Sequence, residues 1–300
     1  MAFRFKRRES VLAGCLRIVN EQVADITGIL RKESAEGLSA EQVHHVRTCL
    51  KRLRALLRLV RGEIARDVLT AAIATFRTTS RRLAPARSAV VLVSTLDQLT
   101  AQHGLVGEEK VERVRAVLTA AIRHSRRTAL ALEKRHMLAA RLEETVFSLE
   151  RVHFCNRGWE ALRGGVRRIY RQGRKAGERL RDAPETKGLH AWRQHLKDLW
   201  YDLSLLSRLP VRALPQMIEQ ARTLSELLGE DRDLALLAVE LDRQPARFGR
   251  DGPPVSLHRA IADGRKRLLR KIFRLSRRLY APRPHAMLTD LRGGWQKWRR

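Results

Sequence analysis

The sequence contains few of the residues that interrupt helices and few of the patterns that build β-sheets. Its 300 residues include 18 glycines and 9 prolines, and β-branched residues rarely alternate with polar ones. Apolar residues instead recur at spacings of three and four, which is the period of a helix with one buried face. The sequence therefore argues against a sheet-based fold and predicts a chain that is almost wholly helical.

Cysteines and long apolar runs are also scarce. Cys15, Cys49 and Cys155 are odd in number and lack the spacing of a metal site, which is typical of a reduced, cytosolic protein. No stretch approaches the roughly 18 apolar residues of a membrane span, and the apolar run at 11–13 is too short for an export signal. We therefore expect a cytoplasmic protein that does not enter the membrane.

Acidic residues are outnumbered nearly two to one. The chain has 61 Lys and Arg against 32 Asp and Glu, a formal net charge of +29, and only 11 of the 61 are lysines. Arginine offers a planar fork of donors that suits phosphate oxygens. A charge of this size opposes compaction through self-repulsion. An anionic partner would relieve that repulsion.

Ten helices are expected from the apolar spacing. Ser39 with Gln42 forms a capping box at the start of one of them. Pro85 and Pro184 mark breaks, and Gly229 is placed to end another helix. The expected ranges are 8–31, 39–61, 63–84, 88–101, 108–155 with one possible break, 158–181, 186–207, 213–228, 232–243 and 256–280.

One pattern occurs twice at an offset of 146 residues. The matched pairs are His44 with His190, Arg47 with Arg193, Leu50 with Leu196, Lys51 with Lys197, Leu53 with Leu199, and Leu57 with Leu203. A repeat of this length predicts a duplicated unit of about four helices. We therefore predict an all-α fold of two four-helix bundles, related by a pseudo-twofold axis around a basic central groove. The halves would span 5–156 and 157–282, followed by an irregular basic tail at 283–300.

The first copy of the repeat carries an unmixed row of basic side chains, here called the first ladder. Its members are His44, Arg47, Lys51, Arg54, Arg58 and Arg61. The row is shifted by one residue, about 100° of helix rotation, from the apolar row that includes Val46, Leu50 and Leu53. The ladder should therefore border the core and line a groove between helices.

The second copy, here called the second ladder, is shorter. It holds His190, Arg193 and Lys197, after which Trp200 and Ser204 replace the arginines. The preceding helix adds basic residues, of which Arg167, Arg171 and Arg174 are further candidates for the groove. A solvated basic face is the alternative, but such faces usually mix acids with bases, and the first ladder contains no acid.

Other uses of these histidines are weaker. His45 and Cys49 are spaced as metal ligands could be, but no third or fourth ligand follows at a suitable spacing, so no metal site is expected. His44 and His190 could accept a phosphoryl group, yet neither ladder has an acid to hold Mg²⁺ and no nucleotide-binding motif is present. We expect no catalytic residue and no cofactor. Acids such as Asp231 and Asp233 are expected to hold arginines in place.

The doubled motif H-x-x-R-x-x-x-K resembles that of the CHAD family, the conserved histidine α-helical domains. The element Tyr-Arg-x-Gly-Arg at 170–174 and the Arg-Asp pair at 232–233 are similar to further motifs of that family. The resemblance covers roughly residues 8–280. It implies two four-helix bundles around a basic cavity that binds inorganic polyphosphate, with association to polyphosphate granules. Ser88 and Trp200 depart from the pattern, where the family has an acid and an arginine.

The sequence thus favours a non-enzymatic polyphosphate-binding protein. Phe, Trp and Tyr make up 5% of the chain and none lies on the first ladder, whereas proteins that bind single-stranded nucleic acid stack bases on aromatic side chains. Two alternatives stay open: an enzyme of phosphate metabolism, such as a polyphosphatase or phosphotransferase, and a helical nucleic-acid-binding protein.

Overall fold

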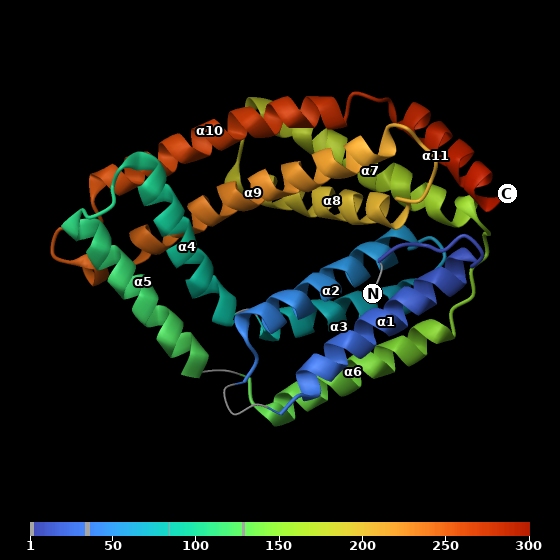
Figure 1. Ribbon diagram of the computed structural model, residues 1–300, viewed down its shortest axis with the longest axis horizontal. Coiled ribbons are helices and arrows are strands. Elements are labelled where there is room, and N and C mark those ends of the chain that lie inside the picture. Colours follow the sequence, from blue (N-terminus) through green and yellow to red (C-terminus); the bar gives the residue numbers. More distant parts are fainter. Residues whose placement is uncertain (1–2, 34–36, 84, 128–129) are drawn as a thin grey trace.

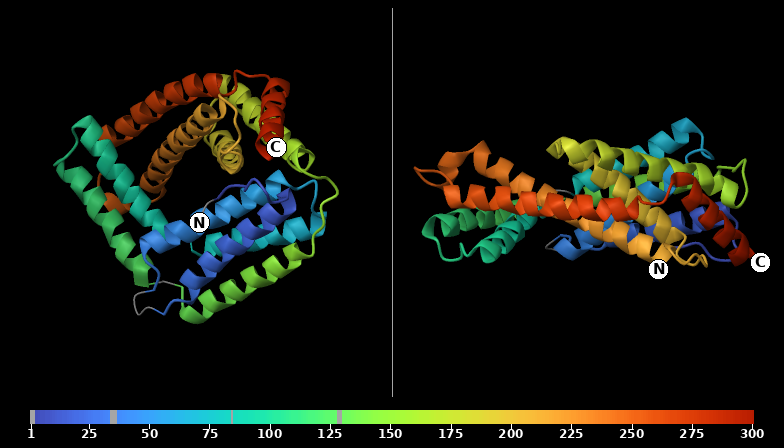
Figure 2. Two further views of the ribbon diagram at one scale, coloured as in Figure 1. Left: turned by 45° about the vertical axis from the view of Figure 1, so that its right-hand side comes forward. Right: turned by 90° about the horizontal axis from the view of Figure 1, so that it is seen from above.

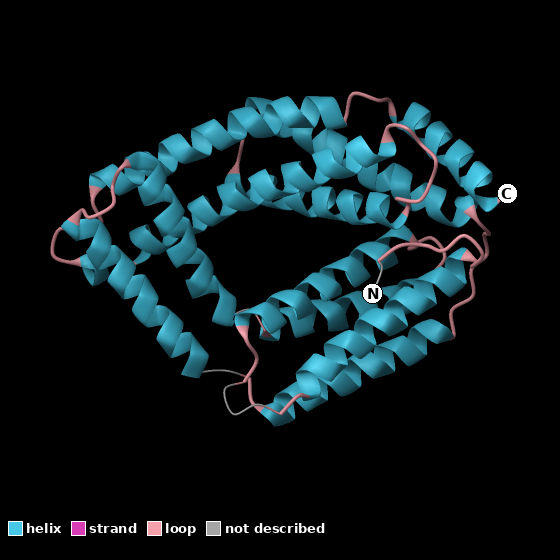
Figure 3. Cartoon of the chain, viewed as in Figure 1, coloured by secondary structure: helices cyan, strands magenta, loops and turns pink. Residues whose placement is uncertain are grey.

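The computed structural model describes residues 3–33, 37–83, 85–127 and 130–300 (Figure 1). Within these ranges the fold is all-α, with eleven α-helices, one 3-10 turn and no strand (Figure 3). The helices are α1 (Val11–Arg31), α2 (Ala40–Leu59), α3 (Arg66–Arg82), α4 (Pro85–His103), α5 (Glu109–Arg127), α6 (Leu132–Glu150), α7 (Trp159–Asp182), α8 (Thr186–Leu205), α9 (Leu214–Arg243), α10 (Val255–Leu279) and α11 (Pro284–Arg299); the 3-10 turn η1 is Pro245–Phe248. None of the described helices is long and apolar enough to cross a membrane.

Several helix boundaries follow the expected signals. The hydroxyl of Ser39 accepts a hydrogen bond from the backbone N–H of Gln42 at 3.2 Å, and the Gln42 side chain accepts one from the Ser39 N–H at 2.8 Å. This capping box starts α2 as predicted. The helix expected over 108–155 is indeed broken once, into α5 and α6. Pro85 is the first residue of α4, where its missing N–H costs nothing.

Two predictions about helix ends are wrong. Gly229 does not end a helix, because α9 continues through it. A Cβ at this position would lie 3.1 Å from a guanidinium nitrogen of Arg193, so glycine leaves room for that side chain. The tail is regular: α11 buries Met287, Leu291 and Trp295, which recur every fourth residue. That spacing was present in the sequence but was outweighed by the basic residues around it.

The helices pack in two groups joined by a hairpin. Helices α1, α2, α3 and α6 contact one another, and α7, α8, α9 and α10 form the other group, with α11 against α7. The hairpin of α4 and α5 stands at the far end, where α4 contacts α9, α10 and α2 (Figures 1 and 2). Lys110 after the hairpin turn pairs with Asp251 of the loop before α10, at 2.9 Å.

The two groups meet where α2 contacts α7 and α8. At this junction Gly165 of α7 lies directly on the backbone of α2, because a Cβ there would come within 1.8 Å of the Leu59 carbonyl oxygen. Only glycine permits so close an approach. From the junction, the ribbons of α2 and α8 diverge toward α4 (Figure 1). The two ladders lie on these two helices.

Candidate functional site

The first ladder lies at the edge of the buried face of α2, as its one-residue offset predicted. Val46, Leu50 and Leu53 are fully buried. Of the ladder, His44 and Arg61 are exposed, whereas the members from Arg47 to Arg58 are half-buried. Half-burial places charged groups partly out of water while their aliphatic stems pack. A row of solvated arginines would be fully exposed instead.

Arginines crowd together around Arg54. Burial, together with the neighbouring guanidinium groups of Arg58, Arg47 and Arg77, lowers the pKa of Arg54 to about 10, against the opposing effect of Asp198. The buried Nε of Arg54 has no hydrogen-bond partner among the described residues. Arg47 donates to the carbonyl oxygen of Ser80 on α3, at 2.5 Å. Positive charge is thus concentrated around Arg54, between α2 and α3.

Arg58, the next residue of the ladder, has a partner within the protein. Its guanidinium donates two hydrogen bonds to Asp198 of α8, at 2.5 and 2.8 Å. The side chain of Asp198 is 5% exposed and also accepts a hydrogen bond from Gln194 at 3.0 Å. Arg58 was predicted as a ligand-binding residue. In the structure it joins the two groups of helices.

A second buried carboxyl lies one turn further along α8. Burial, together with Asp198, raises the pKa of Asp202 well above its usual range, although Arg58 and Arg168 oppose the rise. Arg168 of α7 donates a hydrogen bond to the backbone oxygen of Arg58. Burial, with the nearby charge of Arg61, lowers the pKa of Arg168 to about 10. Arg58, Arg168, Asp198 and Asp202 therefore form one cluster of ionisable groups at the junction of α2, α7 and α8.

The second ladder lies along α8, next to α9. His190 is exposed, and Arg193 and Lys197 are half-buried. Burial lowers the pKa of His190, as do the charges of Arg232 on α9 and of Arg193. His190 is therefore held toward its neutral form. Its ring can give a hydrogen bond to an anion without carrying a charge of its own.

The acids near the second ladder hold arginines, as expected. Asp231 is buried and accepts a hydrogen bond from Arg265 at 2.9 Å. Asp233 lies 3.6 Å from a guanidinium nitrogen of Arg232. Both basic partners are on α9 or α10, so these helices add charge beside α8.

Basic groups of both α2 and α8 act on one tyrosine of α8, Tyr201. Burial raises the pKa of Tyr201 on α8, and Arg52 of α2 and Arg193 of α8 both act against that rise. Trp200 stacks on Tyr201 with ring centroids 4.9 Å apart and is half-buried, so it borders the core rather than lying within it. Ser88, the other departure from the family pattern, lies among the residues whose side chains are not described.

The three candidates on α7 do not gather at one place. Arg167 lines a pocket of about 350 Å³ that it shares with Arg61 and Arg168. Arg174 pairs with Glu178 at 2.9 Å and lines a different pocket, next to Arg277 of α10. Arg171 is exposed. Arg168 of α7 bonds the backbone of α2, although it was not among the predicted site residues.

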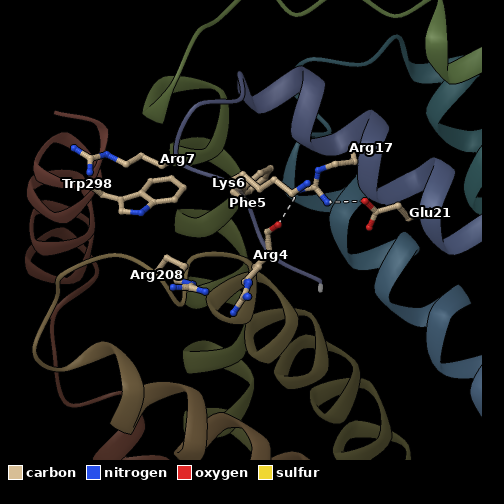
Figure 4. Close-up of a pocket in the computed structure, with 8 residues that line it drawn as sticks. All are labelled: Arg4, Phe5, Lys6, Arg7, Arg17, Glu21, Arg208 and Trp298. Carbon is tan, nitrogen blue, oxygen red and sulfur yellow. Dashed lines mark hydrogen bonds and ion pairs between the residues drawn. The ribbon is translucent and has the colours of Figure 1, made fainter. Parts of the chain in front are cut away.

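A further basic pocket of about 510 Å³ lies at the chain ends (Figure 4). Arg4, Arg7 and Arg208 surround it, together with Trp298 of α11. Arg17 beside it is bound by Glu9 and Glu21 (2.6 and 3.2 Å). None of the predicted site residues lines this pocket, so it is a separate basic surface that any binding experiment has to distinguish from the ladders.

Sequence reasoning missed three basic residues that surround the ladders: Arg77, Arg168 and Arg232. Each lies on a neighbouring helix and reaches α2 or α8 only through tertiary packing. Arg232 alone had a signal in the sequence, the Arg-Asp pair that resembles a family motif. Arg77 and Arg168 are ordinary members of Arg-rich helices, and no spacing rule distinguishes them.

Comparison with known proteins agrees with the fold described above. A search of curated proteins finds no match. The crystal structure of the CHAD domain from the plant Ricinus communis superposes with a TM-score of 0.53 and 18% sequence identity, over 95% of this chain and 89% of that one. This likeness supports the fold. The family model of the CHAD domain matches residues 18–242, most of the length of the chain, and the protein therefore belongs to the CHAD domain family.

Proposed function

We propose that this protein binds inorganic polyphosphate, without catalysis, along the two ladders. The observation that carries the proposal is the crowding of Arg47, Arg58 and Arg77 around the half-buried guanidinium of Arg54. Such a cluster of like charges costs stability. A bound polyanion would offset that cost, and selection for binding explains why the cluster exists.

The chemistry of the ladders suits a phosphate chain better than a nucleic acid. Polyphosphate presents oxygen acceptors on all sides and has no bases, so a groove lined with guanidinium and ammonium groups is sufficient to bind it. Trp200, the aromatic side chain nearest the second ladder, is half-buried and already stacked on Tyr201. Base stacking would need free aromatic surfaces.

The proposed binding surface differs somewhat from the sequence-based set. His44, Arg47, Lys51 and Arg54 of α2 would form one wall, and His190, Arg193 and Lys197 of α8 the other, with Arg77 and Arg232 beside them. Arg58 would hold the two walls together through Asp198. Arg167, Arg171 and Arg174 would contribute more weakly, from the outer surface of α7. We also propose that the two groups of helices are the two halves of the internal repeat.

The acids near the ladders do not favour an enzyme. Transfer of a phosphoryl group needs carboxylates that hold Mg²⁺ at the phosphate. Asp198 and Asp231 instead accept hydrogen bonds from arginines, and Asp202 is buried. A protein of this kind would attach itself, or a partner, to polyphosphate granules in the cytoplasm.

The test is the affinity for fluorescently labelled long-chain polyphosphate, measured by anisotropy at several salt concentrations. Arg47→Glu combined with Arg193→Glu should weaken binding at least tenfold and reduce its salt dependence, because each lost phosphate contact removes about 0.7 from the slope of log K against log salt. Lys51→Gln combined with Lys197→Gln should act in the same direction. Circular dichroism would check that the helices persist.

The matched control is Arg141→Glu combined with Arg292→Glu, which changes the net charge equally on exposed positions of α6 and α11. This control should bind almost as well as the unaltered protein. Equal losses in both pairs would mean that net charge, rather than the ladders, binds the polyanion. Loss on Arg4→Glu with Arg208→Glu alone would assign binding to the pocket at the chain ends. Displacement by DNA at equal phosphate concentration would overturn specificity for polyphosphate.

A further inference from the structure

A separate cluster lies on the edge of α2 that faces α1. The Nε2 atom of His45 lies 2.5 Å from an Oδ2 atom of Asp25 on α1, and the Sγ atom of Cys49, one turn along α2, lies 3.6 Å from the same nitrogen. The Sγ and Oδ2 atoms are 4.0 Å apart. Three different ligand-type atoms therefore surround one point. Sequence spacing had suggested that His45 and Cys49 lack a third ligand, but the fold supplies one from α1.

The three distances resemble those around a tetrahedral metal ion. Zinc bonds of about 2.3 Å to sulfur and 2.0–2.2 Å to nitrogen and oxygen place neighbouring ligand atoms roughly 3.4–3.6 Å apart. The sulfur–nitrogen distance of 3.6 Å already fits, and the sulfur–oxygen distance of 4.0 Å is slightly long. The nitrogen–oxygen pair is closer, at 2.5 Å, as expected when a proton rather than a metal lies between them. Small side-chain rotations would open that pair.

We propose that Asp25, His45 and Cys49 form a binding site for a divalent transition metal, with Zn²⁺ or Co²⁺ as the fitting ions. Thiolate, imidazole and carboxylate are the ligands that Zn²⁺ takes in proteins, and a water molecule would complete a tetrahedron. As the sulfur–metal bond forms, the thiol proton leaves to solvent. The ion would join α1 to α2 beside, but not within, the first ladder.

A cysteine–histidine–aspartate catalytic triad does not fit the same residues. In a triad the nucleophile and the acid bind different nitrogens of the imidazole ring, so that the ring can pass a proton between them. Here Asp25 and Cys49 both approach Nε2. In addition, Cys49 is completely buried, whereas a nucleophile must reach its substrate. The carboxylate oxygen, the ring nitrogen and the sulfur instead surround one point, as the ligands of a metal ion do.

The exposure of the three side chains fits a metal site that an ion can enter from solvent. Cys49 forms its buried end, while the side chains of His45 and Asp25 are 49% and 34% exposed. An ion could therefore enter from solvent through His45 and Asp25 and reach the sulfur last. The open side would hold the fourth ligand, which points to a site that exchanges its metal rather than one sealed in the core.

Cobalt binding gives a direct test, with the reduced protein freed of polyphosphate so that no phosphate competes for the ion. Titration with Co²⁺ should saturate at one ion per chain and produce thiolate-to-cobalt charge-transfer absorption with the strong visible bands of a tetrahedral complex. Cys49→Ala should remove the charge-transfer absorption, and His45→Ala should weaken binding at least tenfold. Zn²⁺ should displace Co²⁺ and raise the melting temperature of the unaltered protein.

Two matched controls make the test specific. His44→Ala changes the adjacent histidine of the ladder, and Cys155→Ser removes the exposed thiol. Both should keep the cobalt spectrum. Absence of charge-transfer absorption in the unaltered protein, or its persistence in Cys49→Ala, would overturn the proposal. Because His45 is exposed, His45→Ala should keep the fold, so a cobalt spectrum unchanged in that variant would also overturn it.

Discussion

The guanidinium of Arg58 on α2 binds the carboxylate of Asp198 on α8 through two hydrogen bonds, 140 residues apart in sequence. It is a nearly buried ion pair between the two groups of helices, with Asp198 5% exposed. Removing one partner of such a pair leaves the other charge uncompensated. The pair therefore matters more for how the groups are joined than for the energy that it contributes.

The first prediction concerns this pair. Asp198→Asn should lower the free energy of unfolding by about 2–4 kcal/mol, because Arg58 keeps its charge in a desolvated place. Urea denaturation followed by circular dichroism would measure the loss. The double variant Arg58→Met with Asp198→Leu should recover part of it, since apolar residues pay no desolvation cost. If the double variant were no more stable than Asp198→Asn, the unpaired charge of Arg58 would not be the cause of the destabilisation.

Substitution of Asp202, unlike that of Asp198, should not destabilise the fold. Its two carboxyl oxygens are buried without hydrogen-bond partners in the described part of the chain, and burial raises its pKa. Asp202→Asn should therefore leave stability at pH 7 unchanged or raise it by up to about 1 kcal/mol. The same denaturation series measures it. A loss as large as that of Asp198→Asn would mean that Asp202 is ionised and paired.

Arg54 is predicted to trade stability for binding. Arg54→Met should raise the free energy of unfolding by roughly 1–2 kcal/mol, because it removes a desolvated charge from three like charges while keeping the apolar stem. The same change should weaken polyphosphate binding several-fold. Measuring both quantities on one preparation is decisive. If both fell together, Arg54 would be a structural residue.

Adjacent glycines on α7 provide a matched pair. Gly165→Ala should destabilise by about 3 kcal/mol or more, since its Cβ would overlap the Leu59 carbonyl oxygen. A Cβ atom at Gly164 would have no neighbouring atom within 4 Å, so Gly164→Ala should stabilise α7 by up to about 1 kcal/mol. Thermal unfolding would compare the two. Equal effects would contradict the close approach of α7 to α2.

Stability should also depend on pH through two histidines of α8. Burial lowers the pKa of both His190 and His195 below the usual 6.5. Arg232 and Arg193 lower that of His190 further, whereas at His195 Asp198 opposes the effect of burial and Arg58 adds to it. As the pH falls below 6.5, the unfolded chain takes up protons that the folded chain excludes, so stability decreases. His195→Gln should reduce that decrease between pH 7 and 5. Because Asp202 acts in the opposite direction, the variant should be compared with the unaltered chain at each pH.

The sequence predicts the local features well because they depend on short spacings. The buried row of α2 and the edge position of the first ladder follow from a period of 3.6 residues. The capping box of Ser39 follows from two polar residues spaced three apart. The prediction for Gly229 failed because it also relied on a local rule, in which a glycine marks a helix end. In the structure the glycine leaves room for the side chain of Arg193, which lies on another helix.

Partners distant in sequence could not be predicted. Nothing near Arg58 in the chain points to Asp198, and nothing near His45 points to Asp25. Both contacts arise when helices pack, and packing selects among many equivalent arginines and acids. That is why the ladders could be identified from the sequence while the residues that hold or neutralise them could not.

The last helix has a consequence for where the chain can be opened and joined. Arg299 of α11 donates a hydrogen bond to the backbone oxygen of Glu9 at 2.6 Å, and Trp295 meets Phe5 edge-on. The segment before α1 and the last helix are therefore neighbours, and α11 lies on the side away from the α4–α5 hairpin (Figure 1). A circularly permuted chain, linked across these ends and opened in the loop at 249–252, should fold.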